Sequence, residues 1–402
     1  MSDRRSAASN ALCLWFARWR SLTVPDATAP EVSGHRDPAA RTPVVFRLVP
    51  AGKVRGMGTV VITGADSPLG RRVAALAAAD PQTDGAIALT GGPVAGLPDS
   101  VDVRRIDLGA DDVKPHFEGA DAVMHLATSV PASPTAPTQD VERARRVFEA
   151  AGDAAVPHVV ALSSATVYGA WANNPVPLTE EATLRPNPGF AFAAERAEIE
   201  RLGSEWRDAH PGAVLTVLRP ARTAGADRRE WLVPALRPGP AVPETAEEPP
   251  VQFLDLDDLA AAIDLGRRRR LAGAFNVAPD GSVPGDEVRS LTGAPLKLPL
   301  PERVAGRVVR WGFRWGLGPT PPELVPYTLH PWTVANDRLR AQGWSPTVTN
   351  EEACVEAFEA GAWATMSPRR RQEIALGVAG AGLAGVVTGA ALVARRWLRS
   401  RR

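Results

Sequence analysis

Short apolar runs alternate with longer amphipathic stretches through the central part of the chain. From residue 58 onward, β-branched apolar runs recur, and stretches with helical spacing lie between several of them. Continuous apolar strands separated by helices are typical of a parallel sheet that is buried on both faces. We therefore predict strands at Thr59–Thr63, Ala86–Thr90, Val101–Ile106, Ala122–Leu126, His158–Leu162 and Val214–Leu218, and helices at Leu69–Ala79, Val141–Ala151 and Phe192–Trp206.

This order of elements predicts an α/β fold, a Rossmann-like doubly wound parallel sheet with a smaller C-terminal substrate lobe. We expect the Rossmann domain over residues 57–230 and the substrate lobe over residues 231–360, interleaved with the Rossmann core. A helix near Asp257–Gly266 and a strand near Ala274–Val277 follow the Pro-rich residues 234–251. Doubly wound sheets bind ligands at the carboxyl ends of their strands, so the site is expected there.

The chain before the first strand has a different composition. Residues 1–56 are rich in Ala, Pro and Arg, and we expect a disordered or poorly ordered extension. Met57 stands directly before the first strand and is a candidate start of translation. An alternative is a surface anchor in which Trp15, Phe16 and Trp19 enter the membrane interface beside neighbouring arginines.

A second segment outside the expected fold lies near the C-terminus. Ile374–Ala394 is a run of 21 residues without charge, which as a helix spans roughly 31 Å and matches a bilayer core. Gly385 and Gly389 form a GxxxG pair, which suits close helix packing in lipid. Arginines flank both ends, so the positive-inside rule leaves the orientation open. We predict a transmembrane helix that holds a cytoplasmic domain at the membrane; a Gly/Ala-rich soluble helix is the alternative.

Charge and cysteine content narrow the possible functions. The formal net charge of +1 gives no reason to expect a nucleic-acid partner. The two cysteines are far apart, which argues against a disulfide framework and a structural zinc site. The six histidines have no metal-binding spacing, and we expect no metal site.

The first predicted strand runs into a glycine-rich turn, residues 63–70, with the sequence TGADSPLG. The turn resembles the TGxxGxxG fingerprint of the extended short-chain dehydrogenase/reductases, the NAD-dependent epimerase/dehydratase family. Gly64 and Gly70 match its first and third glycines, which permit the tight turn and close helix–strand packing. Ser67 stands at the middle glycine, and Leu69 lies in the first turn of the helix. The resemblance implies NAD or NADP, with the pyrophosphate at the helix N-terminus.

Further residues match the family's cofactor-binding positions in the same order. Asp107 and Leu108 resemble the Asp-Leu pair that contacts the adenine, and Leu126 and Ala127 belong to a His-Leu-Ala turn along the cofactor. The second strand ends in Thr-Gly-Gly, without the acidic residue that holds an NAD ribose or an arginine for a 2′-phosphate. The sequence therefore leaves the choice between NAD and NADP open.

The catalytic motif is only partly retained. Residues 163–169, SSATVYG, are similar to the family's SSxxVYG segment, whose hydroxyl polarises the substrate, and by register this hydroxyl is that of Ser164. The family then has YxxxK, in which Tyr is the general acid/base and Lys holds the nicotinamide ribose and lowers the Tyr pKa. Phe192 stands at the Tyr position and Arg196 at the Lys position. Phe cannot transfer a proton, whereas Arg keeps its charge and can still bond ribose hydroxyls.

Few other residues are available to replace the missing phenol. The chain has two tyrosines, Tyr168 in the VYG turn and Tyr327 in a late loop. Tyr327 and Glu195 are the alternative acids. The resemblance continues through Leu218–Pro220 and Ala274–Val277 and covers roughly residues 58–350.

Three functions remain open from the sequence. The first is a family member that binds NAD(P) with impaired or absent standard acid/base catalysis, acting as a sensor, chaperone or assembly partner. The second is an active NAD(P)-dependent oxidoreductase or epimerase acting on a nucleotide sugar or a lipid alcohol. The third is a membrane-anchored non-catalytic scaffold. The resemblance also implies a homodimer.

Overall fold

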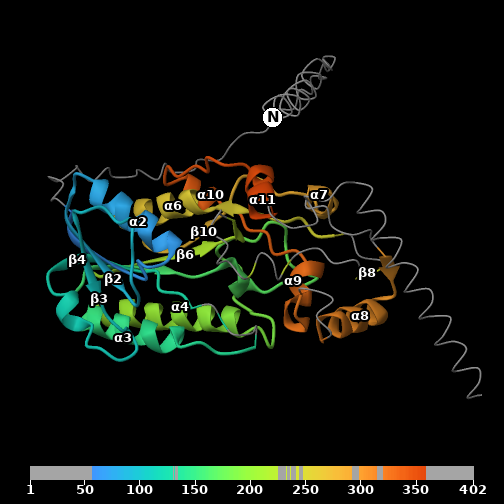
Figure 1. The fold of residues 1–402 in the computed structure, drawn as a ribbon, viewed down its shortest axis with the longest axis horizontal. Coiled ribbons are helices and arrows are strands. Elements are labelled where there is room, and N and C mark those ends of the chain that lie inside the picture. The colour runs from blue at the N-terminus through green and yellow to red at the C-terminus, as the bar shows by residue number, and fades with distance from the viewer. Residues whose placement is uncertain are drawn as a thin grey trace, which may run out of the picture. The chain divides into compact units, whose positions relative to one another are not determined.

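Seven parallel strands form the central sheet of the protein, which is described by a computed structural model (Figure 1). Their order across the sheet is β10-β6-β5-β4-β1-β2-β3. The chain reverses its direction of winding between β1 and β4, which makes this the switch point where doubly wound sheets bind ligands. The strands are β1 (Met57–Thr63), β2 (Thr83–Thr90), β3 (Val101–Arg105), β4 (Ala120–His125), β5 (His158–Leu162), β6 (Val214–Pro220) and β10 (Gly273–Val277).

The structure describes residues 57–129, 131, 135–224, 232, 236, 241–243, 248–291, 298–314 and 320–358. The predicted extension over residues 1–56 and the predicted transmembrane helix Ile374–Ala394 lie outside these residues. Within the described ranges, no helix combines the length and apolar character that a membrane crossing requires.

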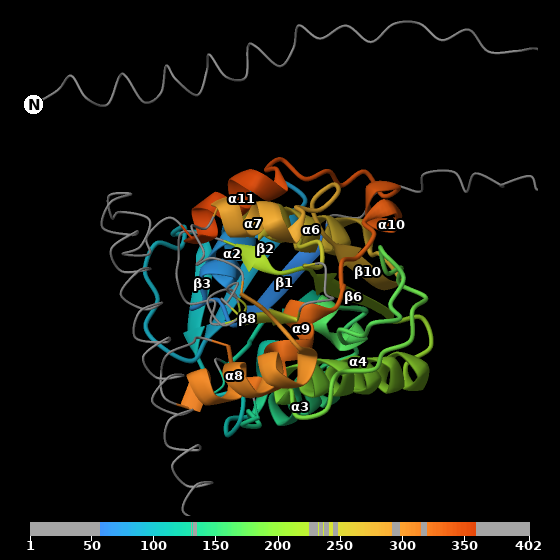
Figure 2. The same cartoon turned by 90° about the vertical axis from the view of Figure 1, so that its right-hand side faces the viewer.

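Helices cover both faces of the sheet (Figures 1 and 2). One face carries α2 (Pro68–Ala79) and α6 (Leu256–Arg269), which pack against each other, and the opposite face carries α3 (Asp140–Asp153) and α4 (Ala191–Ala209). The ends of α6 show why it forms. The Asp255 carboxylate accepts hydrogen bonds from the amides of Asp257 and Asp258, and arginines occupy the last turn, where they favour the helix dipole.

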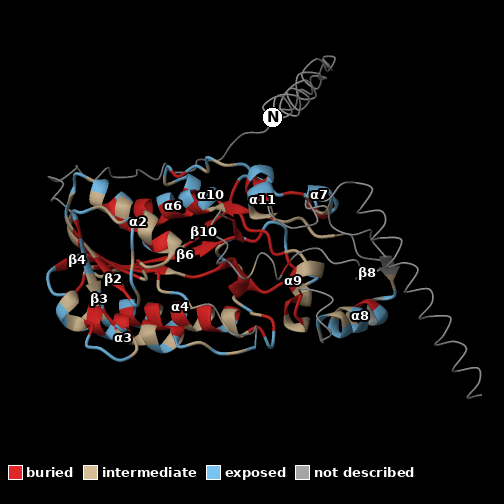
Figure 3. Cartoon of the chain, viewed as in Figure 1, coloured by how far each residue is buried: buried red, intermediate tan, exposed pale blue. Residues whose placement is uncertain are grey.

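Alternate residues of β1 enter two separate cores. Val60 and Ile62 pack with residues of α2 and α6, whereas Val61 packs with residues of α3 and α4. Because successive strand residues point to opposite faces, a continuous apolar strand requires cover on both sides. Figure 3 shows the strands of the sheet buried between these helical layers. The α/β prediction is therefore confirmed, and the predicted strands and helices differ from the observed ones by a few residues at their ends.

Residues after β6 build a smaller, irregular region and also return to the sheet. In Figure 1, α7, α8 and α9 lie at one end of the molecule, whereas α6 and β10 complete the Rossmann core. The remaining elements are η1 (Lys114–His116), η2 (Ala165–Tyr168), β7 (Thr223–Ala224), β8 (Ala241–Pro243), β9 (Leu254–Asp255), α7 (Gly285–Leu291), β11 (Leu298–Leu300), α8 (Glu302–Arg314), η3 (Pro322–Leu324), α9 (Val325–Leu329), α10 (Asp337–Arg340) and α11 (Asn350–Phe358).

Candidate functional site

The turn between β1 and α2 requires glycine at two positions. Gly64 has a φ of 73°, in the region that favours glycine, and a Cβ there would lie 2.6 Å from the Ala127 Cα atom. A Cβ on Gly70 would lie 2.2 Å from the Gly64 carbonyl oxygen. Gly64 therefore lets the turn approach the end of β4, and Gly70 lets α2 pack against the turn.

Ser67 closes this turn with its hydroxyl group. The Ser67 Oγ donates to the Gly64 carbonyl oxygen at 2.8 Å and accepts from the Gly70 amide at 2.9 Å, which makes Ser67 the N-cap of α2. Pro68, the first helical residue, has no N–H. In the described structure, the Leu69 amide is thus the one N–H among the first three helical residues that the turn does not use. The N-terminus of α2 therefore offers an anion fewer free backbone N–H donors than a turn with the full three-glycine fingerprint would offer.

The ends of β2 and β4 lie beside the glycine-rich turn, and the end of β3 lies beside that of β2. The Gly64 amide donates to the Leu89 carbonyl oxygen at the end of β2, and the Leu126 amide donates to the Thr63 carbonyl oxygen. After β3, the Asp107 carboxylate accepts from the Gly109 amide at 2.8 Å, which fixes that loop. The predicted cofactor-binding segments therefore meet at one edge of the sheet.

A cavity of about 550 Å³ opens at this edge. The predicted cofactor-binding residues line it, except Gly70, which lies behind Gly64. The predicted catalytic positions line it as well. The predicted residues in its wall are Gly64, Ser67, Leu69, Asp107, Leu108, Leu126, Ala127, Ser164, Phe192 and Arg196.

Ser164 lies in the wall of the cavity at the start of η2. Its Oγ accepts from the Thr166 amide at 3.3 Å and lies 3.0 Å from the Thr166 Oγ1. Both contacts are satisfied with Ser164 as acceptor, so its hydroxyl proton remains available for a ligand. The neighbouring Ser163 hydroxyl instead donates to the buried Glu200 carboxylate.

Phe192 and Arg196 are one turn apart on α4 and both reach the cavity. The Arg196 Cζ atom lies 5.0 Å from the centre of the Phe192 ring. The Arg196 side chain is 2% exposed, and its Nη2 forms an ion pair with the fully buried Asp140 carboxylate on α3. The guanidinium that was expected to hold a ribose is therefore directed toward α3.

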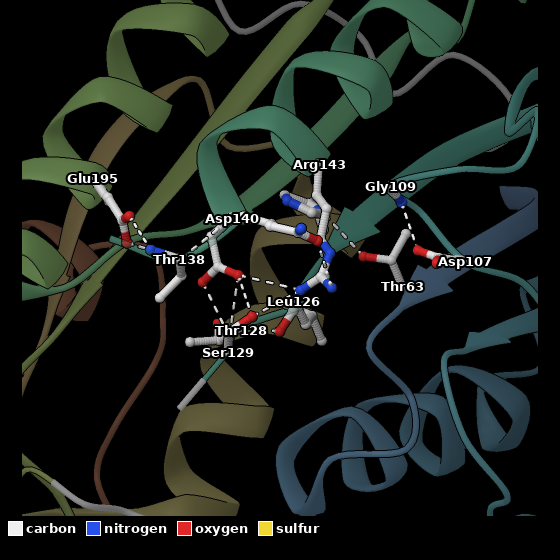
Figure 4. A network of polar contacts seen from close by, with 12 residues as sticks. Thr63, Asp107, Gly109, Leu126, Thr128, Ser129, Thr138, Asp140, Arg143 and Glu195 are labelled. Atoms are coloured by element: carbon white, nitrogen blue, oxygen red, sulfur yellow. Dashed lines mark hydrogen bonds and ion pairs between the residues drawn. The ribbon is translucent and has the colours of Figure 1, made fainter. Parts of the chain in front are cut away.

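Asp140 is the centre of a polar network that joins α3, α4 and the loop after β4 (Figure 4). The Ser129 hydroxyl donates to Asp140 Oδ1 at 2.6 Å, and the Arg143 Nη1 lies 3.6 Å from the same oxygen. Thr138 accepts from the Asp140 amide and donates to the Glu195 carboxylate at 2.8 Å. Glu195, the alternative acid, is thus held by Thr138 and is not part of the cavity wall.

The charges of this network affect one another strongly. Burial raises the pKa of Asp140, but Arg196 and Ser129 outweigh it and hold this pKa below its usual range. Burial lowers the pKa of Arg196 despite the nearby carboxylate, although an arginine remains charged at neutral pH. Burial, followed by the charge of Arg196, lowers the pKa of His125 to about 4, so this imidazole is neutral at pH 7.

Both tyrosines are held away from the cavity wall. The Tyr168 hydroxyl donates to Asn276 and accepts from Arg219, both at 2.7 Å, and burial raises its pKa to about 12. The Tyr327 hydroxyl donates to the Thr166 carbonyl oxygen at 2.9 Å, and burial raises its pKa as well. Tyr327 therefore supports the segment beneath Ser164 and is not positioned as an acid in the cavity.

Ser129 and Arg143, which line the cavity, and Asp140, which binds both of them, were not predicted from the sequence. An acidic residue in the first turn of a helix is ordinarily explained by the helix dipole, so Asp140 gave no distinct signal. Its partner Arg196 is 56 residues further along the chain, and only the packing of α3 against α4 brings the two together.

Comparisons with known proteins agree with this architecture. The chain is similar in structure to UDP-glucose 4-epimerase from Thermus thermophilus in complex with NAD, with a TM-score of 0.55, 20% identity, and coverage of 77% of this chain and 100% of that one. It is also similar to UDP-N-acetylglucosamine 4-epimerase from Methanobrevibacter ruminantium, with a TM-score of 0.55, 19% identity, and coverage of 75% and 97%. At these identities the likeness shows the fold alone.

A comparison with curated protein sequences finds no match. The sequence profile of the NAD dependent epimerase/dehydratase family matches residues 60–278, from β1 to the end of β10. This match covers more than half of the chain, and it includes the glycine-rich turn and the SSATVYG segment. The protein belongs to the NAD dependent epimerase/dehydratase family.

Proposed function

We propose that this protein binds NAD or NADP in the cavity but lacks the standard acid/base catalysis of its family, so that it acts as a dinucleotide-binding sensor or assembly partner. One observation carries the proposal. Phe192 stands in the cavity wall where a phenol is needed, and the Arg196 beside it is committed to the buried Asp140.

The residues of the cavity fit a dinucleotide. Gly64 and Gly91 leave the turn side of the cavity without side chains, and Leu69 keeps an amide for a phosphate oxygen. Asp107 and Leu108 would border the adenine, and Ala127 would lie along the cofactor. When bound, the cofactor would supply hydride transfer.

The chain's own residues do not complete such a reaction. Among the described residues of the cavity wall, the ionisable side chains are Asp66, Asp107, Arg143 and Arg196. An arginine stays protonated at neutral pH and cannot serve as a general base. The carboxylates of Asp66 and Asp107 belong to the turn after β1 and the loop after β3, the side that we expect to hold adenosine. The Ser164 hydroxyl can orient a substrate oxygen, but a serine alone does not replace a phenol whose pKa a lysine has lowered.

An active oxidoreductase or epimerase is the second candidate. Ser164 in the cavity wall favours it, and so do the structural relatives named as UDP-sugar epimerases, which suggest a nucleotide sugar as substrate. A lipid alcohol is the other substrate class, if the chain is held at a membrane. In this case a group outside the Tyr and Lys positions has to move the proton.

Cofactor titration followed by turnover measurements tests the proposal. We expect calorimetry on the full chain to detect NAD⁺ or NADP⁺, and we expect no turnover of UDP-glucose, UDP-N-acetylglucosamine or a sterol-type alcohol by the unchanged protein. The double variant Phe192→Tyr with Arg196→Lys is expected to gain turnover, and Phe192→Leu is the matched control that adds no hydroxyl. Turnover by the unchanged protein that persists in Phe192→Leu would favour the second candidate.

We further propose that Ile374–Ala394 anchors a cytoplasmic domain to the membrane, on the strength of its uncharged sequence. The full chain is then expected to sediment with membranes after carbonate washing, whereas a chain ending at Ser367 stays in the supernatant. Equal behaviour of the two chains would remove the anchor. A homodimer is proposed from the family resemblance, and light scattering on the shorter chain tests it.

A further inference from the structure

Asp66 is a charged residue in the cavity wall that the proposed function leaves without a role. It lies in the glycine-rich turn, between Gly64 and Ser67, and is partly buried. A carboxylate in this turn would be unfavourable if it faced the phosphates of a dinucleotide. Its actual direction is therefore informative.

The Asp66 carboxylate faces the end of β2. A Cβ atom built on Gly92 would lie 3.9 Å from the Asp66 Oδ2 atom. Gly91, the residue before it, also lines the cavity and contributes no side chain. The carboxylate thus occupies the neighbourhood that a side chain at the end of β2 would reach.

In dinucleotide-binding folds, the end of the second strand lies beside the adenosine ribose. An acidic residue after the second strand commonly accepts a hydrogen bond from the adenosine ribose, and it disfavours a 2′-phosphate. In this chain β2 ends at Thr90 and is followed by Gly91 and Gly92, so no acid is provided there. We propose that Asp66 replaces it from the opposite side, binds the adenosine ribose hydroxyls and makes NAD the preferred cofactor over NADP. This inference rests on the proposed binding of a dinucleotide.

The distribution of charge along the cavity supports this assignment. The two carboxylates of the described wall, Asp66 and Asp107, belong to the turn after β1 and the loop after β3, the side expected for adenosine. The wall arginines, Arg143 and Arg196, belong to α3 and α4. Arg71 donates to the Asp66 carbonyl oxygen but is not part of the wall. A 2′-phosphate would thus face a like charge, which is strongly unfavourable.

Binding measurements on the full chain test the proposal without relying on catalysis. By calorimetry, we expect NAD⁺ to bind about tenfold or more tightly than NADP⁺. Asp66→Asn should weaken NAD⁺ about tenfold or more, because a charge-assisted hydrogen bond is lost, while NADP⁺ binding stays equal or improves. Asp84→Asn is the matched control, since it removes the same charge from an exposed position at the start of β2.

A second variant moves the carboxylate from the glycine-rich turn to the end of β2. Gly92 has no positive φ and has room for a Cβ atom, so Asp66→Asn combined with Gly92→Asp places an acid just after β2. We expect this double variant to regain the NAD⁺ preference that Asp66→Asn loses. Equal affinity for the two cofactors, or an unchanged preference in Asp66→Asn, overturns the assignment of Asp66 alone. If neither NAD⁺ nor NADP⁺ binds, both the proposed function and the assignment of Asp66 are overturned.

Discussion

Two buried ion pairs, Arg196–Asp140 and Arg219–Glu200, use the same chemistry in different surroundings. Arg219 bonds Glu200 through Nε and Nη2, and its Nη1 donates to the Tyr168 hydroxyl at 2.7 Å and to the Glu180 carbonyl oxygen at 3.2 Å. For Arg196, Asp140 is the one hydrogen-bond acceptor within the described residues, and its buried Nε has none there.

This difference in hydrogen bonding distinguishes Arg219–Glu200, a structural pair, from Arg196–Asp140, a pair that borders the cavity. Arg219 and Glu200 lie outside the cavity wall, and their network is satisfied within the fold. Arg196 is in the wall, and a buried donor without an acceptor is rare enough in folded proteins to need an explanation. Arg219 is thus held by several acceptors of the fold, whereas Arg196 is held by the Asp140 carboxylate.

Removing the Asp140 charge is expected to have the largest effect. Asp140→Asn leaves Arg196 buried without an anion, and it also takes the negative charge from Arg143, which lies 3.6 Å from the same carboxylate. We expect a loss of about 3–5 kcal/mol in the free energy of unfolding, measured by urea denaturation. Glu198→Gln is the control, since it removes the same charge from a partly exposed residue of α4 that pairs with Arg201, with an expected change of about 1 kcal/mol or less. An Asp140→Asn protein as stable as the control would show that the ion pair is not formed.

Acid should destabilise the fold through His125, whose pKa is lowered by burial and then by the charge of Arg196. The unfolded chain binds a proton at this residue below pH 6.5, whereas the folded protein does so only near pH 4. The unfolded state therefore holds more protons in this window, and stability falls as the pH is lowered through it, by about 3 kcal/mol in total. Urea denaturation between pH 7 and pH 4 measures the slope. His125→Gln should flatten it, and an identical slope in this variant would contradict the depressed pKa.

Removing the Glu200 charge is expected to cost less than removing that of Asp140. In Glu200→Gln, Arg219 keeps the Tyr168 hydroxyl and the Glu180 carbonyl oxygen as acceptors. We expect a loss of about 1.5–3 kcal/mol, the value of hydrogen bonds to a charged group. The same urea denaturation series gives the direct comparison. If Glu200→Gln proves more destabilising than Asp140→Asn, the distinction between the two pairs is wrong.

The smallest expected effect concerns the contact between Phe192 and Arg196. Phe192→Leu removes a ring that lies 5.0 Å from the guanidinium carbon. We expect a loss of about 1–2 kcal/mol, because the guanidinium is buried while the ring is only partly buried. Thermal unfolding detects it, and Phe192→Tyr, which keeps the ring, should leave the midpoint nearly unchanged. A large loss in Phe192→Tyr would mean that the cavity has no room for the hydroxyl.

The sequence predicted the fold well because its apolar runs are continuous and correctly spaced. Val60 to Ile62 require burial on both faces, and only a covered parallel sheet provides this. The glycine-rich turn was also predictable, since Gly64 and Gly70 have steric reasons that act within a few residues.

The polar network around Arg196 could not be predicted in the same way. Its register on α4 was clear from the sequence, but its partner depends on how α3 packs against α4. Tyr168 gives a similar lesson, because its hydroxyl is engaged by Arg219 and Asn276, which are 51 and 108 residues away. Side-chain pairing over such separations follows from the tertiary structure, whereas strand and turn patterns are local.

The Ser67 hydroxyl should slow the opening of the glycine-rich turn. Because it bonds both Gly64 and Gly70, the turn is held by bonds within the chain itself, and we expect binding to require little further loss of conformational entropy there. A turn with glycine at this position would have to be ordered by the ligand. In the unliganded protein, the Gly70 amide should therefore exchange its hydrogen with solvent slowly, as an amide of a stable helix does.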